Sequence, residues 1–214
     1  MKVIFMGTPA FSVPSLHEIY HHSGHEIIAV VTNIDKPQGR GKKLKPPPVK
    51  TAAMEHNLPV IQVKDLHDPD LAEEIAGLNP DVFVVVAFRI LPDILLEIPR
   101  YGALNLHASL LPEYRGPAPI QWALIHGEEM TGITIMQIDS GIDTGDILLQ
   151  EKVRIDENET AGELSERLSL IGAKLIAEAL DGVENDMLSP LKQDMRQATR
   201  APKITPDMQH INWE

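Results

Sequence analysis

The sequence predicts an α/β fold of the Rossmann-like class, an open, mostly parallel sheet with helices on both faces. Short apolar runs of strand length alternate with segments in which apolar residues recur at helical spacing, the pattern of successive βαβ units. One run, Asp81–Ala87 (DVFVVVA), is almost entirely apolar, as expected for a central strand of a parallel sheet. With 214 residues, 43% of them hydrophobic, the chain is long enough to bury one substantial core.

The first half of the chain supplies strands and helices in alternation. We expect strands at Lys2–Met6, Ile27–Thr32, Pro59–Val63 and Asp81–Ala87, and helices at Pro14–His22, Thr51–Asn57 and Asp68–Leu78. The turn after the first strand holds one glycine, Gly7, where a dinucleotide-binding turn needs three, so NAD is not expected. His17 and His21 are one helical turn apart, but no carboxylate or cysteine accompanies them in a ligand pattern. A solvated helix end is therefore favoured, and no metal is expected.

The second half is expected to extend the sheet and then cover it. Residues 102–106 (GALNL) form a short apolar strand, and further strands are expected at Ile133–Met136 and Ile147–Gln150, with a helix at Pro119–His126. Thr160 and Glu163 have the spacing of a capping box at the start of a long helix with an apolar stripe. Gly182 is expected to lie beyond the end of that helix.

Composition excludes several classes of protein. The chain has no cysteine, so disulfides, thiolate metal sites and a thiol nucleophile are excluded. Its first apolar run is too short for a signal peptide or a membrane span, and we expect a cytoplasmic monomer without membrane association. A net charge of −12 argues against general affinity for nucleic acid, although a local basic patch can still dock RNA.

The candidate catalytic residues lie between Asn105 and Asp146. Asn105 and His107 are two apart on a strand, so both project from one face. An Asn amide can donate to an oxyanion, and a His can act as acid or base when a carboxylate such as Asp139 or Asp143 orients it. Because no Gly-x-Ser-x-Gly elbow is present, the set favours attack on a carbonyl or formyl carbon by a nucleophile that the substrate brings. Taken alone, each residue is better explained as a loop cap, a buried imidazole or a turn residue, and only the pattern as a whole favours catalysis.

The motif around these residues resembles the formyltransferases that use 10-formyltetrahydrofolate. It consists of Asn-x-His-x-Ser-Leu-Leu-Pro-x-Tyr-Arg-Gly followed by Gly-x-Asp-Thr-Gly, and both the spacing and the order agree. The resemblance implies the formyltransferase fold, with Asn105, His107 and Asp143 as the catalytic residues. Many members have Pro between His and Ser where this chain has Ala108, from which we expect little consequence because that residue carries no proton.

The resemblance also implies a site for reduced folate. Its contacts are expected from two segments, which comprise Phe88, Arg89, Ile90 and Leu91, and Ser109, Leu110, Leu111 and Pro112. Both segments and the Asp143 loop follow apolar strands, so we expect all three to converge at one edge of the sheet. Close relatives have a small or polar pair at positions 88 and 89. Arg89 here either pairs with the glutamate tail of folate or caps a strand end.

A basic run at residues 35–50 stands out from the acidic chain. It has six cationic residues against one aspartate, a local charge of +5, so the remaining residues carry −17. A solvated loop is the ordinary explanation, whereas a cationic finger on an acidic body suits a phosphate backbone. The run is similar to the loop by which methionyl-tRNA formyltransferases engage tRNA. The resemblance implies that tRNA contacts come from Arg40, Lys42, Lys43 and Lys45.

The resemblance implies a domain organisation and a reaction. Residues 1–200 are expected to form the catalytic domain, and residues 201–214 the start of a linker to a C-terminal β-barrel domain that this chain lacks. The implied reaction transfers a formyl group from 10-formyltetrahydrofolate to initiator methionyl-tRNA. Alternatives are formyl transfer to an amino sugar or to glycinamide ribonucleotide and, in another class, an inactive RNA-binding module.

Overall fold

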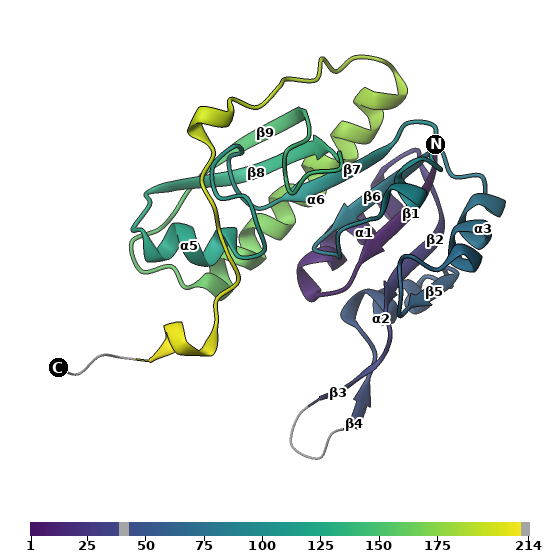
Figure 1. The fold of residues 1–214 in the computed structure, drawn as a ribbon, viewed down its shortest axis with the longest axis horizontal. Coiled ribbons are helices and arrows are strands. Elements are labelled where there is room, and N and C mark those ends of the chain that lie inside the picture. Colours follow the sequence, from purple (N-terminus) through teal and green to yellow (C-terminus); the bar gives the residue numbers. More distant parts are fainter. Residues whose placement is uncertain (39–42, 211–214) are drawn as a thin grey trace.

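A seven-stranded sheet forms the centre of the structure, a computed structural model that describes residues 1–38 and 43–210 (Figure 1). Its strand order is β5-β2-β1-β6-β7-β8-β9. The strands are β1 (Lys2–Gly7), β2 (Glu26–Asn33), β5 (Val60–Val63), β6 (Val82–Val86), β7 (Ala103–His107), β8 (Met130–Gln137) and β9 (Ile147–Arg154). The strands from β5 to β7 pair in parallel, whereas β8 is antiparallel to both β7 and β9. The predicted open, mostly parallel sheet is therefore confirmed.

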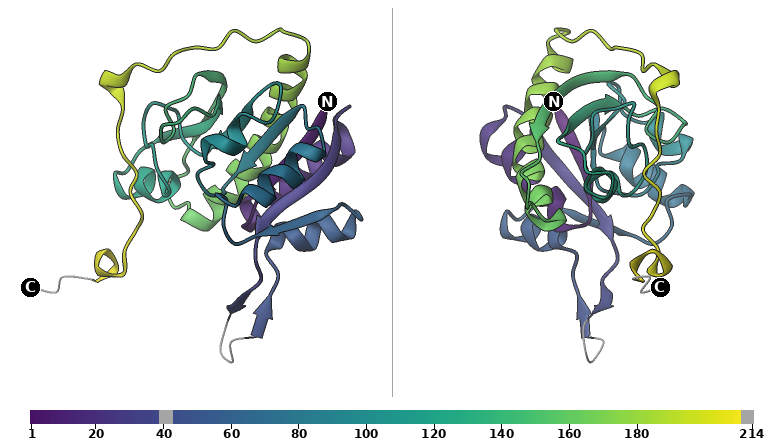
Figure 2. Two further views of the ribbon diagram at one scale, coloured as in Figure 1. Left: turned by 45° about the vertical axis from the view of Figure 1, so that its right-hand side comes forward. Right: turned by 90° about the vertical axis from the view of Figure 1, so that its left-hand side faces the viewer.

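Alternation along the strands divides the core into two layers. On β1, Val3 and Phe5 face one layer, and Ile4 and Met6 face the other. The first layer is covered by α1 (Val13–His22), α2 (Pro48–Glu55), α5 (Pro119–Ile125) and α6 (Ala161–Glu184). The second is covered by α3 (Pro69–Gly77) and the short α4 (Asp93–Leu96), which was not predicted. Helices thus lie on both faces, as Figure 2 shows.

Two predicted helix boundaries need correction. Helix α2 begins at Pro48 and not at Thr51, because a proline in the first turn has the helical φ and needs no intrahelical partner for its missing N–H. Gly182 lies inside α6 and not beyond its end. A Cβ at position 182 would press against the Leu188 side chain, so this glycine allows the chain to fold back closely on the helix. The predicted capping box of Thr160 and Glu163 is present.

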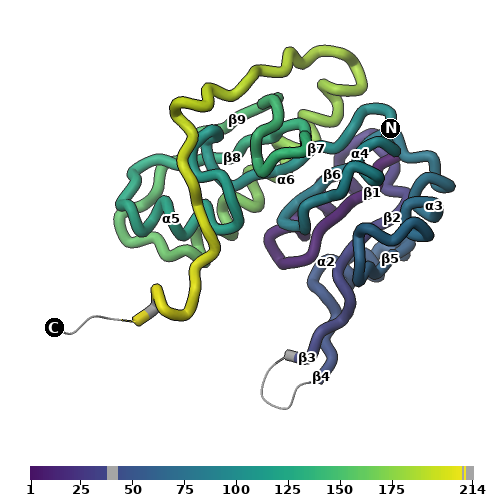
Figure 3. Tube along the Cα trace, viewed as in Figure 1, coloured from purple at the N-terminus to yellow at the C-terminus, as the bar shows by residue number. Residues whose placement is uncertain are grey.

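The basic run forms a hairpin that projects from the body of the molecule (Figures 1 and 2). Strands β3 (Lys36–Gln38) and β4 (Lys43–Lys45) pair antiparallel, where a loop was expected. Lys43 and Lys45 are exposed on β4. Arg40 and Lys42 lie outside the described residues. The tube in Figure 3 follows both strands of this hairpin away from β2.

After α6 the chain returns across the far strands of the sheet. The yellow-green segment in Figure 1 passes over β9 and β8 towards α5. It contains two single 3-10 turns, at Met195–Gln197 and Pro206–Gln209. Among the residues that the structure describes, no helix has both the length and the apolar character needed to cross a membrane.

Candidate active site

The candidate site lies beside the point where the strand order of the sheet reverses, at β6 and β7. The chain builds outwards from β1 through β2 to β5, then returns to the other side of β1 to form β6 and β7. In such sheets ligands bind at the carboxyl ends of the strands that flank this switch point. Strand β7 presents Asn105 and His107 on one face, while Leu104 and Leu106 are buried in the layer beneath α6. The predicted shared face of the amide and the imidazole is therefore confirmed.

His107 is buried and its ring is fixed by a backbone carbonyl. The side chain is 7% exposed, and Nε2 lies 2.9 Å from the carbonyl oxygen of Tyr114. A carbonyl can only accept, so Nε2 carries a proton in either charge state of the ring. Nδ1 is then the nitrogen that can gain or lose a proton, and it faces Asp143 Oδ2 at 3.7 Å. That separation suits an ion pair when the ring is protonated but is too long for a hydrogen bond.

Asp143 is held by the loop that follows β7. Its Oδ2 accepts a hydrogen bond from the backbone N–H of Gly116 at 2.8 Å, and its side chain is largely buried. Gly116 has φ +123°, and a Cβ there would meet the carbonyl oxygen of Ala201 at 2.6 Å, so glycine is required at this position. Asp143 itself has φ 53°, in the left-handed region that Asp tolerates in turns.

The Asp143 loop reaches the site by a different route from the one expected. Because β8 is antiparallel to β7, Gln137 pairs with Leu104, and Ile138 bonds to the Ala103 carbonyl at the start of β7. The loop therefore begins beside the amino end of β7. It then folds back across the face of the sheet to reach Asn105 and His107. The loop thus meets the segment after β6, as expected, but it arrives from the opposite end of β7. Strand direction, which the sequence did not specify, decides the difference.

Local contacts shape the returning loop. Asp139 Oδ1 accepts from the N–H of Gly141 at 2.9 Å and from the Thr144 hydroxyl at 2.6 Å, which closes a tight turn. The loop ends at Gly145, where a Cβ would collide with the Gln137 carbonyl. Asp139 is therefore a turn residue, whereas Asp143 is directed at the imidazole.

A cavity of about 100 Å³ lies between this loop and the segment after β6. It is lined by Asn105, Asp143 and the predicted folate residues Phe88, Arg89, Ile90 and Leu91, together with Val85, Met136, Ile138, Asp139, Gly141, Ile142, Thr144 and Gly145. Within the part of the chain that the structure describes, the Asn105 amide makes no hydrogen bond to protein, so it is free to donate into this space.

Arg89 makes one of the two contacts that the sequence left open, since it caps a strand end. Its two terminal nitrogens donate to the carbonyls of Lys64 and Val63, at 2.9 and 3.1 Å, at the end of β5. It also lines the cavity, with the guanidinium 5.4 Å from the centre of the Phe88 ring. Burial lowers the pKa of this guanidinium from its ordinary value. In this structure Arg89 caps a strand end, but it is the end of β5, which is separated from β6 by β2 and β1 in the sheet.

The second predicted folate segment, residues 109–112, does not line this cavity. Thr134, fully buried on β8, fixes it: its hydroxyl donates to the Ser109 carbonyl at 2.7 Å and accepts from the Leu111 N–H at 3.1 Å. Gln150 Nε2 adds bonds to the Leu111 carbonyl and to the Thr134 hydroxyl. Sequence reasoning missed Thr134, whose one signal is a hydroxyl within an apolar strand.

Tyr114 anchors the carbonyl that binds His107. Its hydroxyl donates to Glu128 at 2.5 Å and lies 3.1 Å from His126 Nδ1, while its backbone N–H donates to the Thr199 hydroxyl at 2.8 Å. Burial and the Glu128 carboxylate raise the pKa of the Tyr114 phenol far above its ordinary value, so it remains a donor at all physiological pH values. With φ 59°, Tyr114 has a left-handed backbone that these contacts hold in place.

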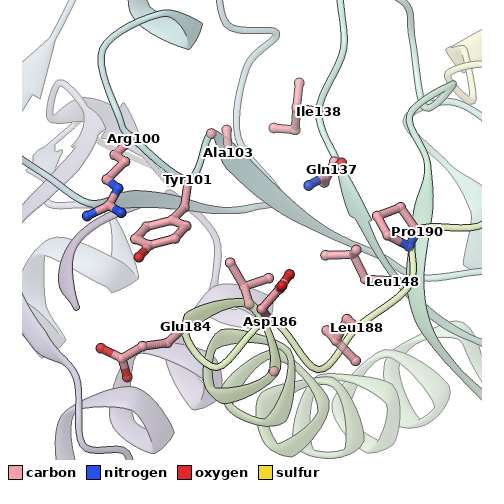
Figure 4. A pocket seen from close by; sticks show the side chains of 13 residues that line it. Arg100, Tyr101, Ala103, Gln137, Ile138, Leu148, Glu184, Asp186, Leu188 and Pro190 are labelled. Atoms are coloured by element: carbon pink, nitrogen blue, oxygen red, sulfur yellow. The ribbon is translucent and has the colours of Figure 1, made fainter.

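A larger cavity, of about 700 Å³, lies elsewhere (Figure 4). It is bounded by the turn before β7, the end of β8 and the last turn of α6, with Arg100 and Tyr101 facing Glu184 and Asp186 across it. None of Asn105, His107 or Asp143 lines it, so its size does not make it the reaction site. Within residues 1–38 and 43–210, no group of three or more His, Cys, Asp or Glu residues is placed to hold a metal ion.

Comparison with known proteins shows the family to which the chain belongs. The family described as "Formyl transferase" matches residues 1–180. Methionyl-tRNA formyltransferase from Alkaliphilus oremlandii is 48% identical over 214 residues, which cover 100% of this chain and 69% of that protein.

Solved structures show the same fold. Glycinamide ribonucleotide transformylase 1 from Symbiobacterium toebii superimposes with a TM-score of 0.74 at 19% identity, covering 91% of this chain and 94% of that one. An N-formyltransferase from Helicobacter canadensis, in complex with folinic acid and dTDP-3-aminofucose, gives a TM-score of 0.72 at 25% identity. That alignment covers 99% of this chain and 72% of the other.

Proposed function

The chain belongs to the formyl transferase family and, within it, to the methionyl-tRNA formyltransferases, and on this premise we propose that it formylates the α-amine of initiator methionyl-tRNA with 10-formyltetrahydrofolate as the donor. The observation that carries the proposal is the grouping of Asn105, His107 and Asp143, which a strand and a returning loop bring together. The identity of 48% to the methionyl-tRNA formyltransferase of Alkaliphilus oremlandii, over the whole of this chain, supports methionyl-tRNA as the acceptor.

The proposed reaction follows from the side-chain atoms that can contact the substrate, which are the Asn105 amide and His107 Nδ1. The methionine amine attacks the formyl carbon, and the carbonyl oxygen becomes an oxyanion that the Asn105 amide and the imidazolium of His107 stabilise. The new C–N bond forms first, and collapse of the tetrahedral species then restores the carbonyl and breaks the bond from the formyl carbon to the folate nitrogen. The proton lost by the amine passes to the departing nitrogen, with His107 Nδ1 or a water beside it as the carrier. Asp143, 3.7 Å away, favours the cationic ring.

The cavity beside Asn105 is suited to the reacting end of the donor. Its volume of about 100 Å³ is below the roughly 300 Å³ at which pockets for whole drug-sized ligands begin. We therefore propose that the formyl-bearing end enters this space and that the rest of the folate lies along Phe88–Leu91. Folinic acid in the Helicobacter canadensis protein supports a folate donor for this fold.

The projecting hairpin favours tRNA over a small acceptor. Lys43 and Lys45 are exposed on it, and the basic run stands out against a body with a net charge of −17. Phosphates of a nucleic acid backbone are the natural partners of such a surface. The similarity to a glycinamide ribonucleotide enzyme is in fold, at 19% identity, and gives no support to that acceptor.

A direct assay tests the proposal. The chain is incubated with 10-formyltetrahydrofolate and either methionyl-tRNA, glycinamide ribonucleotide or an amino sugar nucleotide, and release of tetrahydrofolate is followed. We expect turnover with methionyl-tRNA alone. Turnover with a small amine alone would reassign the acceptor, and binding of tRNA without any turnover would favour the inactive RNA-binding module.

A further inference from the structure

The segment after α6 contacts both loops of the candidate active site, although the family match ends at residue 180. We call residues 191–202 the C-terminal strap. It starts where Leu191 exchanges two backbone hydrogen bonds of 2.8 Å with Ile147, and it ends where the Pro202 carbonyl accepts from Trp122 Nε1 at 2.7 Å. Between these points it crosses over β8 and β9 (Figure 1).

The side chain of Gln193 joins the two site loops. Its Nε2 donates to the carbonyls of Asp143, at 3.0 Å, and Gly145, at 2.7 Å. Its Oε1 accepts from Nε and Nη2 of Arg115, at 3.2 and 2.6 Å. Both amide protons and the carbonyl oxygen of one side chain are therefore used, and no other side chain type of this length offers two donors and an acceptor.

These contacts close a ring around Asp143. Gln193 holds the backbone of Asp143 and, through Arg115, the chain segment whose next residue is Gly116. The N–H of Gly116 in turn binds the Asp143 carboxylate. Asp143 is thus fixed at its backbone and at its carboxylate by the same assembly. A left-handed residue at φ 53° persists only when its surroundings determine it, and this ring does so.

We propose that Gln193 is a positioning residue that holds Asp143 in register with His107. The inference rests on the proposed function, because it assigns a role to Gln193 in that reaction. Gln193 acts through Asp143 and touches no reacting atom. The pairing of Nδ1 with Oδ2 at 3.7 Å depends on where the loop is held, since a shift of about one ångström in such a pair impairs catalysis.

The backbone of the strap is docked independently of this side chain. The Thr199 carbonyl accepts from the Arg115 N–H at 3.0 Å, the Ala201 N–H donates to the Arg115 carbonyl at 2.7 Å, and the Ala201 carbonyl accepts from the Ala118 N–H. Truncating Gln193 therefore leaves the strap in place and removes the amide bridge alone. Gln197 is a matched control, because it is an exposed glutamine of the same strap whose amide binds only Asp194.

The test compares Gln193→Ala, Gln193→Glu and Gln197→Ala in the full chain. Glu at position 193 keeps an acceptor for Arg115 but cannot donate to the two loop carbonyls. We expect kcat for formyl transfer to fall about tenfold in both Gln193 variants, with KM for methionyl-tRNA within about twofold of the parent. Gln197→Ala should match the parent in both parameters.

A double variant separates positioning from general structural damage. In an Asp143→Asn background, where the carboxylate is already removed, Gln193→Ala should lower kcat less than about twofold further. A persistent tenfold loss in that background, or a parent-like kcat for Gln193→Ala, would overturn the inference.

Hydrogen exchange gives an answer that does not depend on activity. Amides of residues 139–146 should exchange about tenfold faster in Gln193→Ala than in Gln197→Ala, and equal rates would reject the bridge. If the parent failed to formylate methionyl-tRNA, the proposed function would be rejected. The hydrogen-exchange rates would still show whether Gln193 holds the loop at residues 139–146.

Discussion

The Nε2 atom of His107 lies 2.9 Å from the backbone carbonyl of Tyr114, and this contact fixes the ring more directly than Asp143 does. Because the carbonyl only accepts, this contact favours the tautomer with the proton on Nε2, and Nδ1 becomes the working nitrogen. Asp143 then faces that nitrogen as a charge at 3.7 Å and not as a hydrogen-bond partner. The orienting role expected for Asp143 is thus shared with a backbone atom that no sequence motif reveals.

Substitution of the imidazole and the carboxylate should show that they act together. We expect His107→Ala and Asp143→Asn each to lower turnover by on the order of a hundredfold, the usual scale for acid–base and oxyanion groups. The double variant should be little worse than the worse single one, because Asp143 is proposed to act through the ring. Single-turnover formylation rates provide the measurement, and fully multiplicative losses would mean independent roles.

Folate binding should distinguish the two predicted segments. Leu91 is 5% exposed and lines the cavity beside Asn105, so Leu91→Trp should fill the space and weaken binding of a stable folate analogue about tenfold or more. Leu110 packs against Gly132 outside the cavity, and Leu110→Trp is the comparison. Calorimetry gives both affinities. An unchanged affinity in both variants would move the folate site elsewhere, and weaker binding in Leu110→Trp alone would favour residues 109–112.

Neutralising the basic hairpin should weaken the use of tRNA and leave folate binding intact. If Arg40, Lys42 and Lys43 meet phosphates, removing each of these charges should flatten the slope of log affinity against log salt by roughly 0.7 to 0.9. The triple Gln variant is measured by binding of methionyl-tRNA at several salt concentrations.

The matched control for the hairpin removes the same charge elsewhere, by changing Lys152, Arg154 and Lys174 to Gln on β9 and α6. We expect this control to keep the parent slope. A hairpin variant with the parent's slope and turnover would make the hairpin a solvated surface feature.

The buried hydroxyl of Thr134 should stabilise the loop after β7. Thr134→Val keeps the shape but leaves the Ser109 carbonyl and the Leu111 N–H without this partner, and an unsatisfied buried group costs about 1–3 kcal/mol. Urea unfolding should show a loss of at least that size, whereas Thr134→Ser should retain most of the stability. Equal stability of the Val variant and the parent would mean that water or a relaxed loop satisfies these groups.

Stability should fall in mild acid because of the histidines between α1 and α2. Burial, and next the neighbouring His56 and His21, lower the pKa of His17, with Glu55 acting in the opposite direction. The unfolded chain then binds the proton more readily, so the free energy of unfolding falls as the pH drops through about 6.5.

His17→Gln should reduce the fall in Tm between about pH 7.5 and 5.5, and the exposed His22→Gln on the same helix is the control. Burial also lowers the pKa of His25, so the slope should lessen and not vanish. An identical dependence of Tm on pH in all three proteins would contradict the assignment.

Much of the fold could be predicted because it depends on local patterns. The apolar runs at 82–86 and along β1 follow from burial of these central strands on both faces, and the capping box at Thr160 follows from spacing alone. The family resemblance, carried by the motif at residues 105–116, is confirmed by the match over residues 1–180. The catalytic and folate-binding assignments remain predictions.

The sequence by itself determined the class of fold and which residues are candidates for the chemistry, because residue type, periodicity and motif spacing are properties of the chain. Only the tertiary structure decided how those residues meet. The antiparallel course of β8 sends the Asp143 loop back across the sheet, and the Tyr114 carbonyl selects the working nitrogen of His107. Gln193 joins two loops whose contacting residues, Asp143 and Arg115, lie 50 and 78 residues away in the chain. Strand direction and long-range backbone contacts arise from packing the whole chain, so no local pattern encodes them.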